Sequence, residues 1–519
     1  MAKRSKSGIA IIILIVALSA AGALLVLMGT QRFGVGMSPD SLVYLSTAKS
    51  LINGKGYVIH DGSAVTNWPP LYPTLLAIIG LTGLSLLDAA RYLNVVLFGL
   101  IIFVSGLWLR KNIESLPLVV LGCLAVLFAQ PLLSVSLHAW SELTFILLVL
   151  LFVMQMQRFL ETGKLPPLIL SAIIAAALFA TRYAGYSVVL SGILLLLLAH
   201  NRRSLRERLL NATVFGLIAV LPMAPWFAKN YAISSTLTGQ RHASIQPLAE
   251  SASHAVYTVA CWLMPSQIPI PPRILIARAL LIMLTVLWTI VARRRRESDD
   301  EGVGSAAAVL AWVLLVYVVL LVISASRVAT DPIDNRLMSP AYVPLMLMIP
   351  LAIQALRSRF GPHSAARTAG AVMAVLFGLW LTYPAYCTAH TVRACRRDGA
   401  GRYLKAAWND SRLTSYLKSK PLNGPVYSNS PEAAYILAGI GAKLSPTAPK
   451  RPTPKMHSPS LAEFKSAIKA KGAYLVWFSN DNYRPWLHPL PEIRSVCNTK
   501  LLFRGAGGSV YMVRLRPAR

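Results

Sequence analysis

The chain has 519 residues, of which 55% are hydrophobic and only 14% are charged, and its formal net charge is +31. This apolar content is far above that of a soluble globular protein, so the composition excludes an ordinary soluble enzyme or binding module. It predicts a protein that places most of its length inside a membrane.

Most of the apolar residues fall in runs of about 18–22, and such a run crosses a bilayer core roughly 30 Å thick. We therefore predict an α-helical polytopic membrane protein with about eleven transmembrane helices. In chain order the predicted spans are 9–28, 88–109, 116–134, 139–157, 167–181, 184–199, 209–228, 274–292, 305–326, 337–356 and 368–388.

The distribution of Lys and Arg among the loops predicts the orientation. Basic residues recur in every second loop, from Lys3 and Arg4 through Arg110 and Lys111 to the run 293–296. The alternate loops carry few basic residues, and loop 135–139 has none. Because cytoplasmic loops carry the excess of Lys and Arg, we expect a cytoplasmic N-terminus. An odd number of spans then places the C-terminal region outside the cytoplasm.

Two units follow from this topology. Residues 1–390 form the transmembrane module, which includes a long first outer loop, 29–87. Residues 391–519 form a small extracytoplasmic α/β domain. In it we expect short strands at 425–428, 473–478 and 509–513, helices at 432–437 and 461–471, and a loop at 445–459.

The last domain is strongly basic. Nucleic acid is a poor partner for a domain outside the cytoplasm, whereas anionic lipid head groups, phosphorylated glycolipids and acidic polymers fit it. Ordinary surface charge that keeps the domain soluble explains it equally well. A Cys395–Cys497 bridge is one pairing open to this domain. No Cys/His spacing indicates zinc, so we predict no cofactor and leave a divalent metal open.

The first outer loop contains several side chains that could catalyse a reaction or bind a substrate: Asp40, Tyr44, His60, Trp68 and Tyr72. Long ordered loops usually carry function. Four of these residues also have a simpler explanation. The carboxylate could be a helix N-cap, the histidine an ordinary loop residue, and the two late aromatics members of the interfacial belt.

Further charged residues lie at the outer ends of predicted spans, where they are costly and are usually functional or paired. They are Glu142, Arg182 (followed by Tyr183), Asp334 and Arg336. Acids and arginines that converge on one face suit a reaction on an anionic lipid. Arginine matches phosphate geometry, and a carboxylate can deprotonate an acceptor hydroxyl or amine.

Structural alternatives exist for these residues too. Glu142 would be favourable at a helix N-terminus in any case. Arg182 could snorkel or pair with Glu142, and Arg336 could pair with Asp331 or Asp334.

Several of these segments resemble the family 39 membrane glycosyltransferases, which have the GT-C fold and include protein O-mannosyltransferases and lipid A aminoarabinose transferases. The resemblance covers roughly residues 9–390. Its motifs are Asp40-Ser41-Leu42-Val43-Tyr44-Leu45, Trp68-Pro69-Pro70-Leu71-Tyr72-Pro73, Ser141-Glu142-Leu143, Thr181-Arg182-Tyr183-Ala184-Gly185 and Asp334-Asn335-Arg336.

The resemblance implies a bacterial enzyme of the cytoplasmic membrane that transfers a sugar from a polyprenyl-phosphate donor to a lipid, polysaccharide or protein acceptor. By this resemblance Asp40 is the catalytic base. Substrate contacts are expected from Tyr44, His60, Trp68, Tyr72, Glu142, Arg182, Tyr183, Asp334 and Arg336. Where many relatives have Asp-Glu, this chain has Asp40-Ser41, and this departure weakens the inference of a metal or a second acid in the first outer loop.

A polytopic transporter or flippase of a lipid-linked or anionic substrate is the alternative. Transporters place ionisable groups near the bilayer midplane and often show internal repeats. Here the ionisable groups lie at span ends and no repeat is visible. This arrangement favours a transferase with its active site at the membrane surface.

Overall fold

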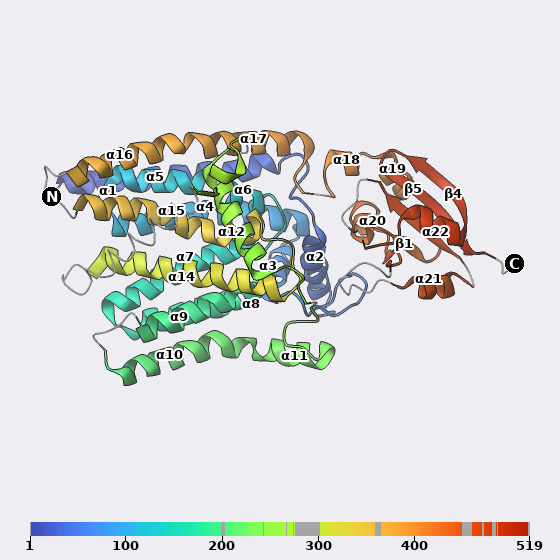
Figure 1. The fold of residues 1–519 in the computed structure, drawn as a ribbon, viewed down its shortest axis with the longest axis horizontal. Helices are drawn as coiled ribbons and strands as arrows, with labels where there is room; N and C mark the ends of the chain where they lie inside the picture. Colours follow the sequence, from blue (N-terminus) through green and yellow to red (C-terminus); the bar gives the residue numbers. More distant parts are fainter. Residues whose placement is uncertain are drawn as a thin grey trace.

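The fold was analysed in a computed structural model. It describes residues 2–198, 203–241, 243–265, 267–272, 274–275, 301–358, 365–401, 403–448, 459–469, 472–479, 484 and 486–516. The molecule is elongated, with a large helical bundle at one end and a small sheet domain at the other (Figure 1).

The bundle and its loops contain α1 (Ala2–Gly29), α2 (Pro39–Ile52), α3 (Leu71–Gly80), α4 (Leu86–Asn112), α5 (Leu116–Leu127), α6 (Gln130–Ser136), α7 (Glu142–Thr162), α8 (Leu165–Thr181), α9 (Tyr186–Leu198), α10 (Leu205–Val220), α11 (Ala224–Ser234), α12 (Leu248–Leu263), α14 (Glu301–Arg327), α15 (Asn335–Ser358), α16 (Ala365–Trp380) and α17 (Thr382–Asp398). Two short 3₁₀ turns, η1 (Tyr183–Gly185) and η2 (Leu221–Met223), precede α9 and α11.

Within the described residues, seven helical stretches are long and apolar enough to cross a membrane: Ile9–Gly29, Leu86–Asn112, Glu142–Thr162, Leu205–Ser234, Ala306–Arg327, Asn335–Arg357 and Thr368–Asp398. A bent pair, α5 with α6, would make an eighth. The pair bends by 44° because Ala129 is extended and Pro131 restarts the helix. The polytopic helical fold class is therefore confirmed.

The number of spans predicted from sequence is not confirmed. The fifth and sixth predicted spans correspond to shorter apolar helices, α8 and α9. The predicted span at 274–292 lies almost wholly outside the described residues. The count of eleven stays a prediction.

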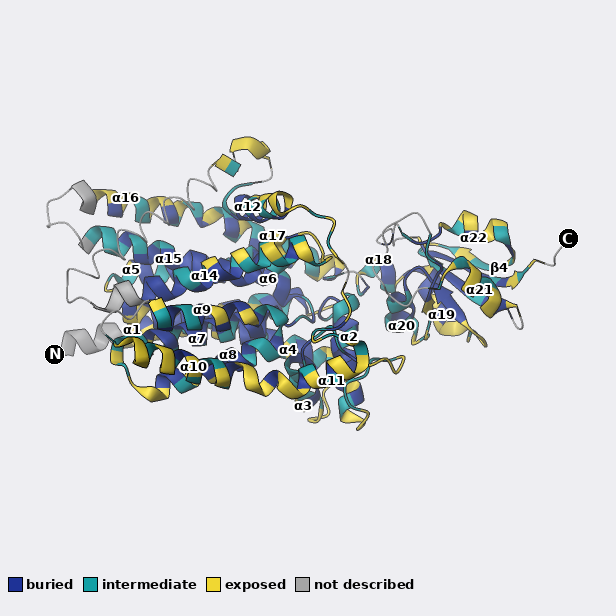
Figure 2. Cartoon of the chain, turned by 60° about the horizontal axis from the view of Figure 1, so that its bottom comes forward, coloured by how far each residue is buried: buried dark blue, intermediate teal, exposed yellow. Residues whose placement is uncertain are grey.

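Burial divides the bundle into a centre and a periphery. The spans in α7 and α15 are the most buried, and those in α1 and α16–α17 are the least. Figure 2 shows the dark, buried centre and the exposed residues along α10 and α16. Apolar side chains such as Leu14, Leu24, Val375 and Leu379 are exposed on the peripheral helices. In a bilayer this surface faces lipid tails, and its exposure therefore costs nothing.

The first outer loop is folded, because it contains α2 and α3, which pack against each other at one end of the bundle. The apolar faces of both helices are buried, with Tyr44 on α2 and Tyr72 on α3 less than 5% exposed. Folding holds this loop in one position, so a side chain on α2 can act at a defined place.

The C-terminal domain contains α18 (Ala406–Asn409), α19 (Arg412–Ser419), β1 (Val426–Ser428), α20 (Pro431–Ala438), β2 (Lys443–Leu444), α21 (Leu461–Ile468), β3 (Ala473–Phe478), α22 (Leu490–Val496), β4 (Cys497–Gly505) and β5 (Gly508–Leu515). The strands form one sheet in the order β2-β1-β3-β5-β4. β1 is parallel to β2 and β3, and β5 is antiparallel to β3 and β4.

The three strands predicted for this domain are confirmed as β1, β3 and β5, and the two helices as α20 and α21. β2 and β4 were not predicted. Most of the predicted loop at 445–459 lies outside the described residues. The thiols of Cys395 and Cys497 are both free, so the bridge considered between them is wrong. Cys395 lies on α17, whereas Cys497 is buried in the core on the far edge strand.

The sheet domain packs against the first outer loop. One hydrophobic cluster joins Tyr44 and Tyr72 of the loop to Tyr403, Trp408 and Phe478 of the domain. The predicted boundary at 390/391 falls inside α17, which continues to Asp398, and the two-unit division stays a prediction.

Backbone contact tightens this junction. A Cβ on Gly36 would come within 2.7 Å of the Gly401 nitrogen, and Gly401 has a φ of +72°. Only glycine meets both requirements at these positions.

Candidate active site

Asp40 lies in the first turn of α2. The helix is capped by Ser38, which shares a capping box with Ser41, and Pro39 occupies the first helical turn. Ser38 is therefore the N-cap, and the interpretation of Asp40 as the cap is wrong. The Asp40 side chain, 26% exposed, instead meets Arg336, with 2.5 Å between Oδ2 and Nη2.

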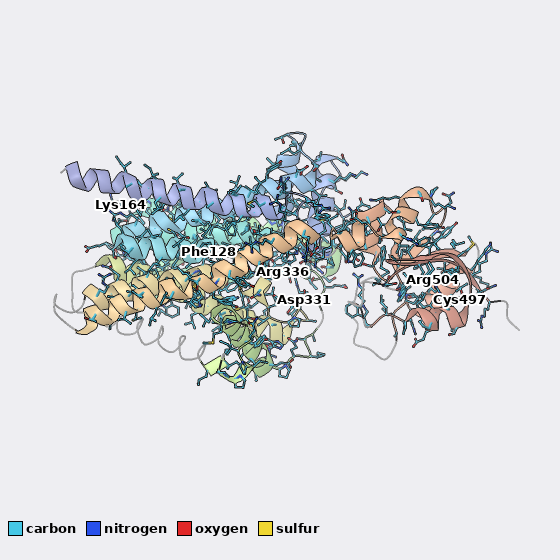
Figure 3. The ribbon with its side chains drawn as sticks, turned by 90° about the horizontal axis from the view of Figure 1, so that it is seen from above. Phe128, Lys164, Asp331, Arg336, Cys497 and Arg504 are labelled. Atoms are coloured by element: carbon cyan, nitrogen blue, oxygen red, sulfur yellow. The ribbon has the colours of Figure 1, made fainter. Side chains whose placement is uncertain are left out.

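Arg336 connects two carboxylates from different parts of the chain. Its Nη2 reaches Asp40, and its Nε lies 2.7 Å from Oε1 of Glu142. Glu142 also pairs with Arg182, at 2.5 Å between Oε1 and Nη1. Figure 3 shows Arg336 at the end of the bundle that faces the sheet domain. We call the four residues Asp40, Arg336, Glu142 and Arg182 the charge chain.

Glu142 is the centre of the charge chain and is fully buried. A fully buried carboxylate can carry its negative charge only when that charge is paired. Here the guanidinium groups of Arg182 and Arg336 both pair with it. Its position as the first residue of α7 adds a favourable helix-dipole interaction. Its second oxygen, Oε2, has no hydrogen-bond partner among the described residues.

Aromatic side chains hold the guanidinium of Arg336 in place. It lies 4.1 Å from the centre of the Trp140 ring, and Trp140 donates a 2.7 Å hydrogen bond from Nε1 to Oγ of Ser38, the cap of α2. His138 stacks on Trp140 with ring centres 4.0 Å apart. Burial lowers the pKa of His138 to about 4, so the ring is neutral and donates from Nδ1 to the Ser134 carbonyl.

Tyr44 lies beside the charge chain. Its hydroxyl is 3.3 Å from Oγ of Ser141, which also accepts a hydrogen bond from Arg182. Burial and the nearby Asp40 carboxylate raise the pKa of Tyr44 above its ordinary value, so the phenol stays protonated. Tyr72 packs edge-on against Tyr44, with ring centres 4.9 Å apart, and this contact supports the Tyr44 ring.

Tyr183 fastens the first outer loop to the bundle. Its hydroxyl donates a 2.7 Å hydrogen bond to the Thr66 carbonyl and accepts hydrogen bonds from Trp226 and Asn230. Trp68, two residues after Thr66, is partly buried against the hydrophobic cluster that contains Trp226.

Two predicted site residues lie outside the charge chain. His60 packs against Tyr435 of the C-terminal domain with the two rings tilted and their centres 4.4 Å apart, and burial lowers the pKa of His60. Asp334 caps α15, because Oδ1 accepts the backbone N–H groups of Arg336 and Leu337 at 3.0 Å each. The pairing of Arg336 with Asp331 or Asp334 through their side chains, considered from sequence, is not what the structure shows.

Two cations near the site were not identified from sequence. Arg241 donates to the Asn67 carbonyl at 2.9 Å, lies over the Tyr183 ring, and interacts electrostatically with Asp40. Lys229 donates to the Val65 carbonyl and lies 3.9 Å from the Trp226 ring centre. Neither pairs with a carboxylate of the described residues within 4.0 Å. Their position in the sequence could have identified them, because both lie in the predicted outer loop after the seventh span.

The arrangement thus contains one partly exposed carboxylate, Asp40, that pairs with Arg336; Arg336 is held in turn by the buried Glu142, and Arg241 interacts with Asp40 as well. An ionised carboxylate so placed can accept a proton or orient a nucleophile. The cations can bind a phosphate. Across the described residues, no three His, Cys, Asp or Glu side chains are grouped to hold a metal ion.

No protein-family model matches the chain, and no curated protein sequence matches it. Solved structures do. ArnT from Cupriavidus metallidurans bound to undecaprenyl phosphate is 15% identical, with a TM-score of 0.58 over 96% of this chain and 97% of that one. The same protein in the apo state is 13% identical, with a TM-score of 0.60 over 98% of both chains. At this identity the match shows a shared fold, and the expected GT-C architecture is confirmed.

Proposed function

We propose that this chain is a membrane glycosyltransferase that moves a sugar from a polyprenyl-phosphate donor to an acceptor. The observation that carries the proposal is the ion-paired Asp40–Arg336–Glu142 arrangement at one end of an ArnT-like bundle. A solved structure of that fold binds undecaprenyl phosphate, which is a lipid of the proposed donor class.

Asp40 is the proposed catalytic base. It is the more exposed carboxylate of the charge chain, whereas Glu142 is fully buried. Arg336 holds the Asp40 carboxylate through its ion pair and directs it, and Glu142 in turn fixes Arg336. An acceptor hydroxyl or amine that hydrogen-bonds to Asp40 would lose its proton as the sugar–phosphate bond breaks. The departing polyprenyl phosphate carries away the electron pair of that bond.

The donor phosphate needs cations that are not already neutralised. The sequence favoured Arg336 for this task and offered Arg182 as a second candidate, but both pair with carboxylates. We therefore assign the phosphate to Arg241, with Lys229 as a second candidate. Arg336 and Arg182 become positioning residues for Asp40 and Glu142.

We further propose the location inferred from sequence: a bacterial cytoplasmic membrane, with the charge chain and the C-terminal domain on the extracytoplasmic side. The transporter alternative gains no support, because the charge chain lies at the end of the bundle that faces the sheet domain. A transfer assay would identify the sugar and show whether the acceptor is a lipid, a polysaccharide or a protein.

The test is a transfer assay on membranes containing the full chain, with a panel of radiolabelled polyprenyl-phosphate sugars. Asp40→Asn should insert normally and lose transfer by about 10²-fold or more, the usual effect of removing a general base. Asp61→Asn is the matched control, because Asp61 lies exposed in the same loop and only accepts the Ser63 amide. Full activity in Asp40→Asn would refute the assignment of the base.

A further inference from the structure

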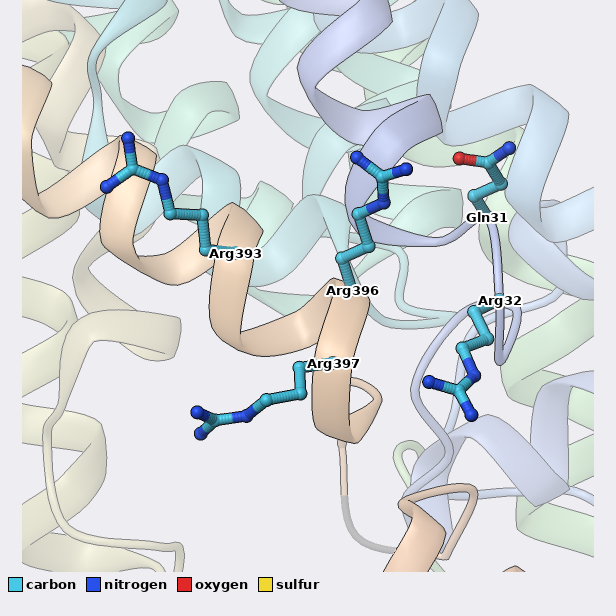
Figure 4. Close-up of a pocket in the computed structure, with 5 residues that line it drawn as sticks. All are labelled: Gln31, Arg32, Arg393, Arg396 and Arg397. Carbon is cyan, nitrogen blue, oxygen red and sulfur yellow. The ribbon is translucent and has the colours of Figure 1, made fainter.

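Four arginines gather where α1 and α17 end. A cavity of about 550 Å³ is lined by Gln31, Arg32, Arg393, Arg396 and Arg397. Gln31 and Arg32 follow α1, and the other three lie on the last turns of α17 (Figure 4). This cluster is separate from the charge chain, whose residues lie on α2, α7 and α15 and directly after α8.

The cluster has an excess of positive charge. Asp398 pairs with Arg397, whereas Arg32, Arg393 and Arg396 have no carboxylate within 4.0 Å among the described residues. Three unpaired guanidinium groups repel one another and attract an anion. Arginine binds phosphate oxygens through several donors at once.

The surroundings indicate what kind of anion fits. The guanidinium groups fan out along α17 and do not converge on one point, as Figure 4 shows for Arg393, Arg396 and Arg397. The long apolar stretch Thr368–Asp398 that ends in the cluster also exposes apolar side chains along its length, with Tyr386 on α17 68% exposed and Leu379 on α16 61% exposed. A small free anion would use neither feature fully. A lipid has a phosphate for the arginines and acyl chains for the apolar face.

We propose that this cluster is a binding site for an anionic phospholipid of the leaflet on the side of the C-terminal domain. The phosphate of the head group is attracted by the combined charge of Arg32, Arg393 and Arg396 and contacts one of them at a time, and the acyl chains lie along the exposed face of α17 and α16. Basic pockets at helix ends are suited to such lipids, each arginine adding to the attraction. The site does not depend on the proposed transfer reaction.

The experiment is a titration of the purified full-length protein in detergent, with lipid-bound and lipid-free protein quantified by native mass spectrometry. The probes are dioleoylphosphatidylglycerol, dioleoylphosphatidylcholine and inorganic phosphate. Arg393→Gln combined with Arg396→Gln should weaken phosphatidylglycerol binding by roughly tenfold and leave phosphatidylcholine binding unchanged. The matched control is Arg110→Gln combined with Arg206→Gln, two exposed arginines away from the cluster. Arg32→Gln, on a different element, provides a second variant if the α17 pair folds poorly.

Phosphatidylglycerol binding equal to the parent in both the α17 pair and Arg32→Gln would overturn the proposal. Equal affinity of the parent for phosphatidylcholine would do so as well, since the site is proposed to select charge. Displacement of the lipid by millimolar inorganic phosphate would show that the cluster takes the free anion, and the lipid assignment would be wrong.

Discussion

Glu142→Gln tests the logic of the charge chain. The substitution keeps the size and one acceptor oxygen but removes the negative charge that faces Arg182 and Arg336. The two guanidinium groups are only 15% and 17% exposed, so water cannot replace the lost carboxylate. Leaving buried partners uncompensated costs about 3–5 kcal/mol. We expect a destabilisation near the lower end, because the amide still accepts a hydrogen bond.

The assay is thermal unfolding of purified protein in one detergent, followed by loss of monomer on size-exclusion chromatography. A loss of about 3 kcal/mol should lower the apparent midpoint by several degrees. Glu161→Gln is the control on the same helix, because its partner Lys111 is 51% exposed. Lys111 stays hydrated when the charge of Glu161 is removed, and the amide can still accept from Gln157, so this change should cost at most about 1 kcal/mol.

A double variant adds a test that single changes cannot provide. Combining Glu142→Gln with Arg182→Gln removes one of the two uncompensated charges, so the double loss should be smaller than the sum of the single losses. A Glu142→Gln protein as stable as the parent and the Glu161→Gln control would refute the reasoning. It would mean that solvent already screens the charge chain.

Three further outcomes follow from the structure. Arg241→Gln should weaken binding of the polyprenyl-phosphate donor by about tenfold with little change in stability, since one charge-assisted contact is worth about 1.5–3 kcal/mol. Unchanged donor affinity in a direct binding assay would show that Arg241 does not bind the donor. For His138, burial lowers the folded-state pKa to about 4, so its stabilising contribution is complete above pH 6.5 and falls, by about 3 kcal/mol in total, as pH drops to 4. Unfolding midpoints measured across that range should fall more steeply in the parent than in His138→Asn, and parallel curves would contradict this. Gly36→Ala should cost about 1–3 kcal/mol because its Cβ would overlap the Gly401 backbone, and limited proteolysis should then cleave the C-terminal domain faster; an unchanged cleavage rate would count against a tight junction.

The sequence by itself determined the features that depend on local patterns. Apolar runs located the long membrane helices, because a bilayer demands continuous hydrophobicity. Alternation and β-branched residues located β1, β3 and β5, and the charged residues Asp40, Glu142, Arg182 and Arg336 stood out because ionised groups are rare at span ends. A family resemblance indicated the GT-C fold, which the ArnT structures share.

Only the tertiary structure decided which of these groups meet. Arg336 lies 296 residues from Asp40 and 194 from Glu142 in sequence, and no local pattern specifies such a pairing. The same holds for Arg241, which interacts with Asp40 only because the two loops are folded over one another. The cap that Asp334 forms on α15 is local by contrast, since its partners are the backbone N–H groups two and three residues later. Side-chain partners of ionised groups are set by the packing of distant helices, since the energy of a buried charge depends on everything around it and very little on its neighbours in the chain.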